Sequence, residues 1–500
     1  MDPTYPDPFR RWMITLFVMT GSFMSQLDVT IANVALPYMQ GTTSASSEQI
    51  TWVLTSYIVT AAIFTPLTGW LASRHGRKRV MIASIAGFTV ASLLCGVAAN
   101  LPQMIGFRIL QGMMGSALLP ISQAVLLDIN PPNRHGQAMA IWGSGTVLGP
   151  IVGPLIGGWL TDNLTWRWVF FINVPVGIAA VTGLVLFMRH RVQDQPGRLD
   201  MLGFVLLGLT VGCFQLVLDR GQMLDWFSSS EIWIEAALGV TGLYLFVVHS
   251  LTARNPFVKL QLFADSNYVI GSVLALFVAV GIFSVLSLLP PLLNGLMGYS
   301  AQQVGLETFP RGIGAMIAMQ LTAPLMTRID PRLIVLGGLA MSMAAVMMMA
   351  GISLQMDGRL FIMAGVMQGI GSGAMFVPLS TLAFSTLPPH LRNEGAALST
   401  LIRNMGASMG ISVLQALTIR NTARVHSYLV EQVRPDNPVL GWSLDGFDTG
   451  ATGAMITLNR EITRQATMMA YVESFSALAL LSLLFAPLIL FLRTGRKRAP

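Results

Sequence analysis

The chain of 500 residues is 53% hydrophobic and only 11% charged, with a net charge of +7. Soluble proteins carry about 25% charged residues, whereas apolar runs of about twenty residues recur here from end to end, so the composition excludes a soluble globular protein and predicts an all-α polytopic membrane protein. Cys95 and Cys213 both lie inside apolar runs, which excludes a disulfide framework and a cysteine metal site.

Fourteen apolar runs are long enough to cross a bilayer as helices. They cover residues 12–36, 50–73, 80–99, 103–126, 138–160, 168–189, 200–218, 231–250, 268–291, 302–326, 332–353, 360–384, 395–418 and 467–492. An even number of spans puts both termini on one side, which would hold 19 Lys and Arg residues against 8 on the other, 5 of them in the long segment 419–466. Because short cytoplasmic loops are rich in Lys and Arg, both termini are predicted to be cytoplasmic, and the basic excess does not indicate nucleic-acid binding.

The first span carries a carboxylate, Asp28, within its closing sequence SQLDVTIANVALP (Ser25–Pro37). Asp28 lies about 24 Å along the span at 1.5 Å per residue, and Arg108 of the fourth span lies at a similar depth. Charges inside a membrane are costly and usually functional, so these two are candidates for proton coupling, with a structural ion pair as the alternative. Asn33 and Gln111, on the same two spans, are candidate substrate contacts.

The short connection between the second and third spans is strongly basic. Its candidate functional residues are Gly69, Ser73, Arg74, Gly76, Arg77 and Lys78. A cytoplasmic location alone explains the charges, but the glycine spacing and the short length indicate a more specific role. Asp128, at the inner end of the fourth span, is the candidate acidic partner of this loop.

The fifth span contains the sequence GSGTVLGPIVGPLIGG from Gly143 to Gly158. Four glycines recur at every fourth residue with two prolines beside them: Gly145, Gly149, Pro150, Gly153, Pro154 and Gly157. In a soluble helix each glycine costs about 1 kcal/mol and each proline about 3, whereas in a bilayer small residues let two helix backbones touch. We expect the glycine stripe to pack against the tenth span; a generic packing face is the alternative.

An internal repeat divides the chain. The sequence QGMMGSALLPISQ from Gln111 is echoed by QGIGSGAMFVPLS from Gln368, and two further echoes occur at offsets of 254 to 259 residues. Arg108 has Gly365 as its counterpart. A parallel duplication of six-helix halves, with a binding site at their interface, is a known transporter architecture.

The second half adds three candidate features. Glu307 and Arg311 are spaced i,i+4 and can pair, either on a proton pathway or as a self-contained surface pair. Arg403 precedes Gly406-x-x-x-Gly410 and is a candidate latch or substrate contact. The segment 419–466, with Trp442, Asp445 and Asp448, is predicted to be an outward-facing loop with short helices.

These motifs together resemble the fourteen-span drug:proton antiporter family of the major facilitator superfamily, the EmrB/QacA type of multidrug exporter. The resemblance covers nearly the whole chain and includes the first-span sequence, the "antiporter motif" of the fifth span, and WRWVFFINVP from Trp166 to Pro175. It implies that the basic loop latches the two halves together and that Arg108 takes part in proton coupling. The family usually has Asp where Ser73 stands; serine can cap a helix but cannot form the charge contact.

The resemblance also implies the domain organisation and the activity. The expected parts are a cytoplasmic tail (1–11), an N-terminal half (12–190), two extra helices with linkers (191–260), a C-terminal half (261–492) and a basic tail (493–500). The expected protein is a multidrug exporter of the bacterial inner membrane that expels hydrophobic or amphipathic compounds by alternating access. It is driven by the proton gradient without a cofactor. In a cell with an outer membrane, relatives work with a periplasmic adaptor and an outer-membrane channel.

Three alternatives remain at this stage. An importer or uniporter on the same fold would not be expected to carry the glycine-proline stripe. An intramembrane enzyme would need a catalytic constellation, but the chain has six scattered histidines and no His-Glu-x-x-His sequence. A non-transporting sensor would need a signalling domain, which the sequence does not suggest.

Overall fold

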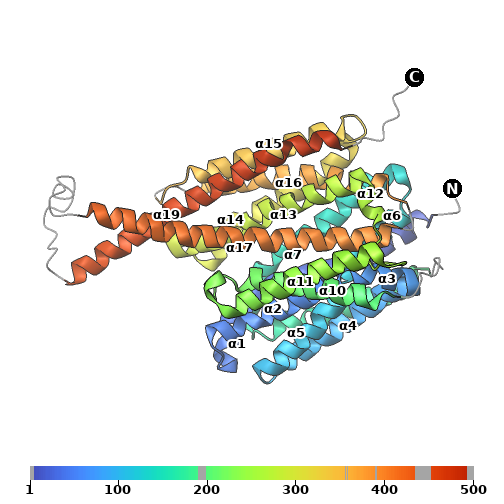
Figure 1. Ribbon diagram of the computed structural model, residues 1–500, viewed down its shortest axis with the longest axis horizontal. Coiled ribbons are helices and arrows are strands. Elements are labelled where there is room, and N and C mark those ends of the chain that lie inside the picture. Colours follow the sequence, from blue (N-terminus) through green and yellow to red (C-terminus); the bar gives the residue numbers. More distant parts are fainter. Residues whose placement is uncertain are drawn as a thin grey trace.

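The computed structural model describes residues 5–189, 199–354, 356, 358–388, 391–433 and 452–492. Within these residues the regular structure is helical throughout, and the long helices run roughly parallel in one elongated bundle (Figure 1). The chain enters the first helix and leaves the last at the same end of this bundle, which we call the terminal face (Figure 1).

The first part of the chain forms helices that pack around α1. Their bounds are α1 Pro8–Thr43, α2 Ser47–Phe64, α3 Leu67–His75, α4 Arg77–Val97, α5 Leu101–Gly115, α6 Leu118–Ile129, α7 His135–Asn163, α8 Trp168–Phe171 and α9 Asn173–Phe187. Two further long helices follow, α10 Met201–Arg220 and α11 Ser230–Thr252.

The remaining helices pack around α13 and α16. Their bounds are α12 Gln261–Ala264, α13 Ser266–Pro291, a π-helical turn Leu292–Leu296, α14 Ala301–Leu325, α15 Pro331–Ala350, α16 Arg359–Ser385, α17 Arg392–Gln432, α19 Thr452–Phe485 and a 3-10 turn Ala486–Phe491.

Each of the fourteen predicted spans falls on one of these helices or on a consecutive pair. Eleven spans of the described chain are long and apolar enough to cross a membrane, and α2 with α3, bent by 56° at their junction, makes a twelfth. The other two predicted spans are α14 and α17, which are long enough but more polar. Their polar residues include Glu307 and Arg311 on α14 and Arg403 on α17.

Two helices run beyond their predicted ends. Helix α1 continues past Pro37 to Thr43. The prediction that 419–466 is a loop with short helices is wrong for its described parts, because α17 continues to Gln432 and α19 already begins at Thr452. Trp442, Asp445 and Asp448, like the tail 493–500, lie outside the described residues.

Outside the main bundle, α17 and α19 hold each other as a helical pair (Figure 1). The Arg424 guanidinium forms an ion pair with Glu473 at 2.9 Å, and the His426 ring is hydrogen-bonded to Asn459 at 3.1 Å. The extension is therefore two paired helices over the residues that are described.

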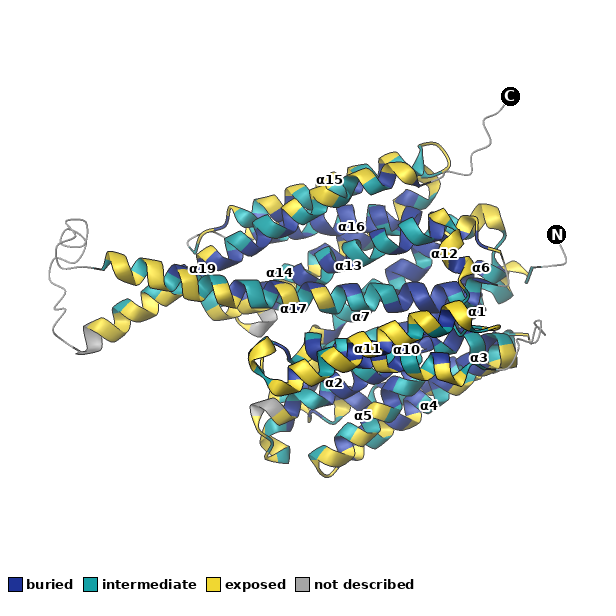
Figure 2. Ribbon diagram, in the orientation of Figure 1, coloured by how far each residue is buried: buried dark blue, intermediate teal, exposed yellow. Residues whose placement is uncertain are grey.

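Helix α10 touches both sets of helices. Gly208 and Gly212 face Ile63 of α2, while Gln215 donates a hydrogen bond to Ser408 of α17 at 2.8 Å. Its neighbour α11 lies at the periphery and is exposed along much of its length (Figure 2). These exposed side chains are mostly apolar, as expected for a surface that faces lipid.

Candidate functional site

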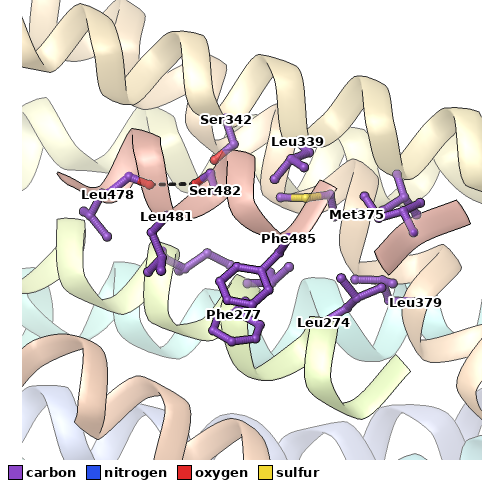
Figure 3. A pocket seen from close by; sticks show the side chains of 15 residues that line it. Leu274, Phe277, Leu339, Ser342, Met375, Leu379, Leu478, Leu481, Ser482 and Phe485 are labelled. Carbon is purple, nitrogen blue, oxygen red and sulfur yellow. Dashed lines mark hydrogen bonds between the residues drawn. The ribbon is translucent and has the colours of Figure 1, made fainter. Parts of the chain in front are cut away.

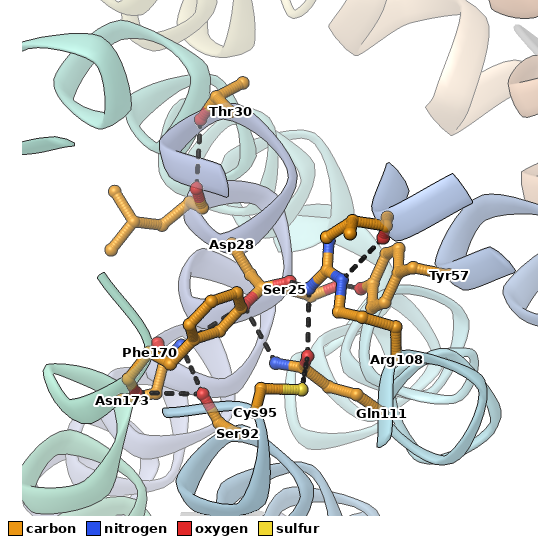
Figure 4. A network of polar contacts seen from close by, with 12 residues as sticks. Ser25, Asp28, Thr30, Tyr57, Ser92, Cys95, Arg108, Gln111, Phe170 and Asn173 are labelled. Carbon is orange, nitrogen blue, oxygen red and sulfur yellow. Dashed lines mark hydrogen bonds and ion pairs between the residues drawn. The ribbon is translucent and has the colours of Figure 1, made fainter. Parts of the chain in front are cut away.

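The buried centre of the first helical set is an ion pair between Asp28 of α1 and Arg108 of α5. Arg108 Nη1 lies 2.5 Å from Asp28 Oδ2, and both side chains are completely buried (Figure 4). The other carboxylate oxygen, Oδ1, accepts hydrogen bonds from Gln111 at 2.8 Å and from Asn173 at 3.3 Å. The carboxylate thus joins α1 to α5 and α9 through three donors.

The Arg108 guanidinium has further partners that do not depend on Asp28. Its Nε donates to the Val53 carbonyl of α2 at 2.8 Å, and Nη1 also donates to Gln111 Oε1 at 2.9 Å. The guanidinium carbon lies 4.6 Å from the centre of the Tyr57 ring and 5.5 Å from that of Phe170. Such cation–π contacts stabilise a desolvated cation, so Arg108 is held by α2 and two aromatic rings as well as by the carboxylate.

Glycine at position 112 makes this geometry possible. A Cβ placed on Gly112 would lie only 2.5 Å from the Tyr57 carbonyl oxygen, so α5 can approach the α2 backbone closely only because the side chain is missing. The close approach lets Arg108, one turn earlier on α5, reach the neighbouring Val53 carbonyl.

The remaining predicted site residues do not all join this network. Gln111 belongs to it, but Asn33 is an exposed residue of α1. Glu307 and Arg311 lie in the other helical set: the Glu307 carboxylate is next to Gly358 at the start of α16, and Arg311 donates to the Ile282 carbonyl of α13 at 2.8 Å. The predicted ion pair between Glu307 and Arg311 is therefore not formed among the described residues, and neither of the two joins the network around Asp28 and Arg108.

Arg403 lies where the two helical sets meet. Its guanidinium carbon is 5.2 Å from the centre of the Trp142 ring of α7, and that ring stacks on Phe376 of α16. The structure thus places Arg403 against an aromatic residue of the opposite set, on the inside of the bundle.

The basic loop between α3 and α4 contacts the start of α17 at the terminal face. Arg77 forms an ion pair with Asp128 of α6, and its Nε donates to Asn393 Oδ1 at 2.7 Å. Asn393 in turn donates to Ser73 Oγ at 3.1 Å. Ser73, which cannot supply the charge usual at this position, still bonds across the junction through its hydroxyl.

Two glycines let the loop fit there. A Cβ on Gly69 would lie 3.0 Å from the Glu394 Cα, so α3 and α17 touch backbone to backbone. Gly76 has φ 84°, a left-handed conformation that glycine adopts without strain, and it ends α3 and begins α4. Of the other candidate basic residues of this loop, Lys78 donates to the Val185 carbonyl and Arg74 is exposed.

The glycine stripe of α7 faces α1 instead of the expected tenth span, α14. A Cβ on Gly149 would lie 2.7 Å from the Leu27 backbone nitrogen, and one on Gly157 would lie 3.3 Å from the Ile31 carbonyl oxygen. The predicted partner is therefore wrong, although the close packing itself is present. Helix α14 packs on a different face of α7, where Gln320 donates to Ser144 at 3.2 Å.

Sequence reasoning gave no role to several polar residues of the site. Tyr57, Ser92 and Asn393 are uncharged and belong to no recognisable spacing, and Asn393 stands between Arg392 and Glu394, so nothing in the sequence singles them out. Asn173 was noticed only within the sequence from Trp166 to Pro175, but it bonds to both Asp28 and Ser92.

Comparisons with known proteins agree with this architecture. Residues 18–411 match the family model described as "Major Facilitator Superfamily". The chain is 34% identical over 468 residues to "Multidrug export protein EmrB" of Escherichia coli K12, covering 93% of this chain and 91% of that protein. It is also 34% identical to "Fatty acid resistance protein FarB" of Neisseria gonorrhoeae, covering 95% of each. Among solved structures, the proton:xylose symporter XylE matches with a TM-score of 0.62 at 14% identity, over 96% of this chain and 97% of that chain.

Proposed function

Because this chain belongs to the major facilitator superfamily, we propose that it exports hydrophobic or amphipathic compounds in exchange for protons. It is a multi-pass membrane transporter and not an enzyme. Near full-length similarity to a protein named for multidrug export supports the direction and the breadth of transport.

The observation that carries the proton-coupling part is the burial of Asp28. Asp28 and Arg108 are both 0% exposed, and an ion pair in such surroundings is a weak source of stability because each charge is desolvated. Intramembrane carboxylates are instead typical of proton pathways. The position of Asp28 between α1, α5 and α9 connects its charge to the packing of three helices.

A proton and Arg108 compete for the same carboxylate. Protonation of Asp28 removes the charge attraction to α5, while Arg108 stays bound to the Val53 carbonyl, to Gln111 and to the two rings. The carboxyl group of α1 can then separate from α5, and Arg108 keeps these hydrogen bonds and ring contacts but loses its counter-charge. Proton binding would in this way favour a different packing of α1 against its neighbours.

The terminal-face contacts support alternating access between two six-helix halves, 12–190 and 261–492, with α10 and α11 as the two extra spans. In the described structure α3 and α17 are in contact at that face, so the halves are closed there. We assign the terminal face to the cytoplasm of a bacterial inner membrane, because the basic loops lie on it. Separation of Arg77 from Asn393 would open the cytoplasmic side.

Partners are proposed on the same basis. The substrates would be small hydrophobic or amphipathic molecules, and the paired extension of α17 and α19 would be the surface for a periplasmic adaptor that leads to an outer-membrane channel. The two paired ends lie on the side opposite the terminal face (Figure 1).

Transport into inverted membrane vesicles tests the proposal. With an acidic lumen, the wild-type chain is expected to accumulate a hydrophobic dye, and a protonophore should abolish the accumulation. Asp28→Asn removes the titratable group and should reduce gradient-driven accumulation to the background of empty vesicles. Asp225→Asn, at an exposed aspartate, is the matched control and should transport normally.

Normal gradient-driven transport by Asp28→Asn would contradict the proton-coupling assignment. Uptake in the opposite direction, into right-side-out vesicles together with protons, would show that the chain is an importer.

A further inference from the structure

The second helical set contains a buried cation without an acidic partner. Arg311 of α14 is only 7% exposed, and its Nη2 donates to the Ile282 carbonyl at 2.8 Å. Its Nη1 is buried without a hydrogen-bond partner, and among the described residues no carboxylate forms an ion pair with the guanidinium. An uncompensated charge is costly to bury, so this site is electrostatically incomplete.

Gln368 of α16 completes one side of the same site. It is 0% exposed, its Nε2 lies 3.5 Å from the Gly281 carbonyl, and its Oε1 has no hydrogen-bond partner. Gly281 and Ile282 are consecutive on α13, so Gln368 and Arg311 converge on one turn of that helix. Rotation of the terminal amide would present its NH2 group, so the pair can offer donors from both side chains.

Comparison of the two repeats shows that the site of Arg311 and Gln368 lacks a carboxylate equivalent to Asp28. Gln368 is the counterpart of Gln111, and Gly365 that of Arg108. A Cβ on Gly365 would lie 3.5 Å from the Arg311 Cβ, so Arg311 enters from α14 beside the position that Arg108 occupies in the first half. Residues 266–291 of α13 contain no Asp or Glu that could replace Asp28. The second half thus keeps an arginine and a glutamine but has no carboxylate on the corresponding helix.

The turn of α13 that Arg311 and Gln368 contact also borders an apolar cavity, although neither of these two side chains lines it. Gly281 and Ile282 also line a cavity of about 40 Å³ between α13, α15, α16 and α19, whose other walls include Phe277, Met375 and Leu478 (Figure 3). This volume holds roughly three water-sized groups. The same turn of α13 therefore faces a buried guanidinium and an apolar space.

We propose that Arg311 and Gln368 bind the carboxylate of an exported amphipathic compound. The inference rests on the proposed export function and names one substrate class for it. A carboxylate supplies the missing charge and can accept two parallel hydrogen bonds from a guanidinium.

Equilibrium binding to the purified full-length chain tests the site without requiring transport. The probes are 11-(dansylamino)undecanoic acid and its methyl ester, which differ in the negative charge, followed by dansyl fluorescence. The wild type is expected to bind the acid at least tenfold more tightly than the ester. Arg311→Gln should remove this preference and weaken acid binding at least tenfold, with Arg311→Lys in between. The matched control is Arg328→Gln, at an exposed arginine after α14, which should keep the preference.

Equal affinity of the wild type for acid and ester, or an unchanged preference in Arg311→Gln, would overturn the proposal. In a further titration, chloride replaces gluconate in the buffer. Displacement of the bound acid by chloride would show that the two anions compete for one site. If Arg311→Gln altered chloride binding alone, the site would hold an inorganic anion and not the amphipath. If Arg311→Gln fails to fold, Gln368→Leu is measured in its place. This substitution should weaken the binding of the acid more than the binding of the ester. Charge-selective binding without transport of any compound would refute the export function but leave this site standing.

Discussion

The pairing of Asp28 with Arg108 combines two roles that substitutions can separate. A structural role depends on the balance of charge, whereas proton coupling depends on the presence of a titratable carboxylate. Both groups are fully buried and are hydrogen-bonded to each other. Removal of one partner therefore differs physically from removal of both.

We expect Asp28→Asn to lower the stability of the protein, because Arg108 then remains buried without its counter-charge. Breaking a buried pair costs about 3–5 kcal/mol, whereas replacing both partners by hydrophobic residues of similar volume is often neutral. The double variant Asp28→Leu/Arg108→Met should therefore recover most of the loss in thermal unfolding measured in detergent, yet still fail in proton-driven transport. If the double variant also recovered transport, the pair would be only structural.

At the scale of the helix, the important feature of α7 is a row of glycines, which have no side chains. The absence of side chains at Gly149, Gly153 and Gly157 lets α1 lie against its backbone. The position of α1 matters because this helix carries Asp28. A displacement of α1 by a side chain on α7 would reach the ion pair through a rigid element.

Gly149→Leu is expected to separate α7 from α1, lower the unfolding temperature and reduce transport several-fold. The larger side chain would overlap the Leu27 backbone, which cannot rotate away, and overpacking typically costs about 1–3 kcal/mol. Gly158→Leu is the matched control on the same helix, because a Cβ there meets nothing within 4 Å. Similar unfolding temperatures and transport rates in the two variants would show that the close approach is unimportant.

The sequence predicted the close packing of α7 but not the helix that it packs against. Four-residue spacing defines a smooth face of one helix and contains no information about the opposing surface. Likewise, the depth of Asp28 and Arg108 could be predicted from their places in apolar spans, while the uncharged partners Tyr57 and Asn173 had no comparable signal. The family resemblance made the overall fold predictable.

The extension of α17 was missed for a different reason. Polarity after residue 418 indicates the end of a membrane span, and polarity alone predicts a loop there. Residues 419–432 nevertheless contain neither glycine nor proline, so nothing in them stops a helix. Leaving the bilayer and ending a helix are separate events, and polarity reports only the first.

For the whole molecule, the contacts at the terminal face decide which side is closed. Arg77, Ser73 and Asn393 connect the α3–α4 loop to α17, and Lys259, between α11 and α13, forms an ion pair with Glu394 at 2.8 Å. These polar contacts surround the Gly69 backbone contact, so one junction involves both halves and the connection between them.

Gly69→Leu should keep this junction open. Its side chain would meet the Glu394 backbone, which shifts the population toward molecules that are open at the terminal face. The reporter is a cysteine introduced at Ala124, which is buried beside Gly69 and Asn393. The two native cysteines, Cys95 and Cys213, are replaced by alanine. The reporter cysteine should react with a maleimide several-fold faster in Gly69→Leu than in the chain that keeps Gly69. Gly337→Leu, where a Cβ meets nothing, is the control. Equal labelling rates in both would mean that the Gly69 contact does not close this face.

The length of α17 has a mechanical consequence. Its 41 residues extend for about 60 Å at 1.5 Å per residue, and some 20 Å of this lies beyond the predicted span. A rod of that length acts as a lever: a tilt of a few degrees about its inner end displaces the Gln432 end much farther than the segment near Arg403. The ion pair between Arg424 and Glu473 joins α19 to the same lever, so small movements around the bundle centre would become ångström-scale displacements outside the membrane.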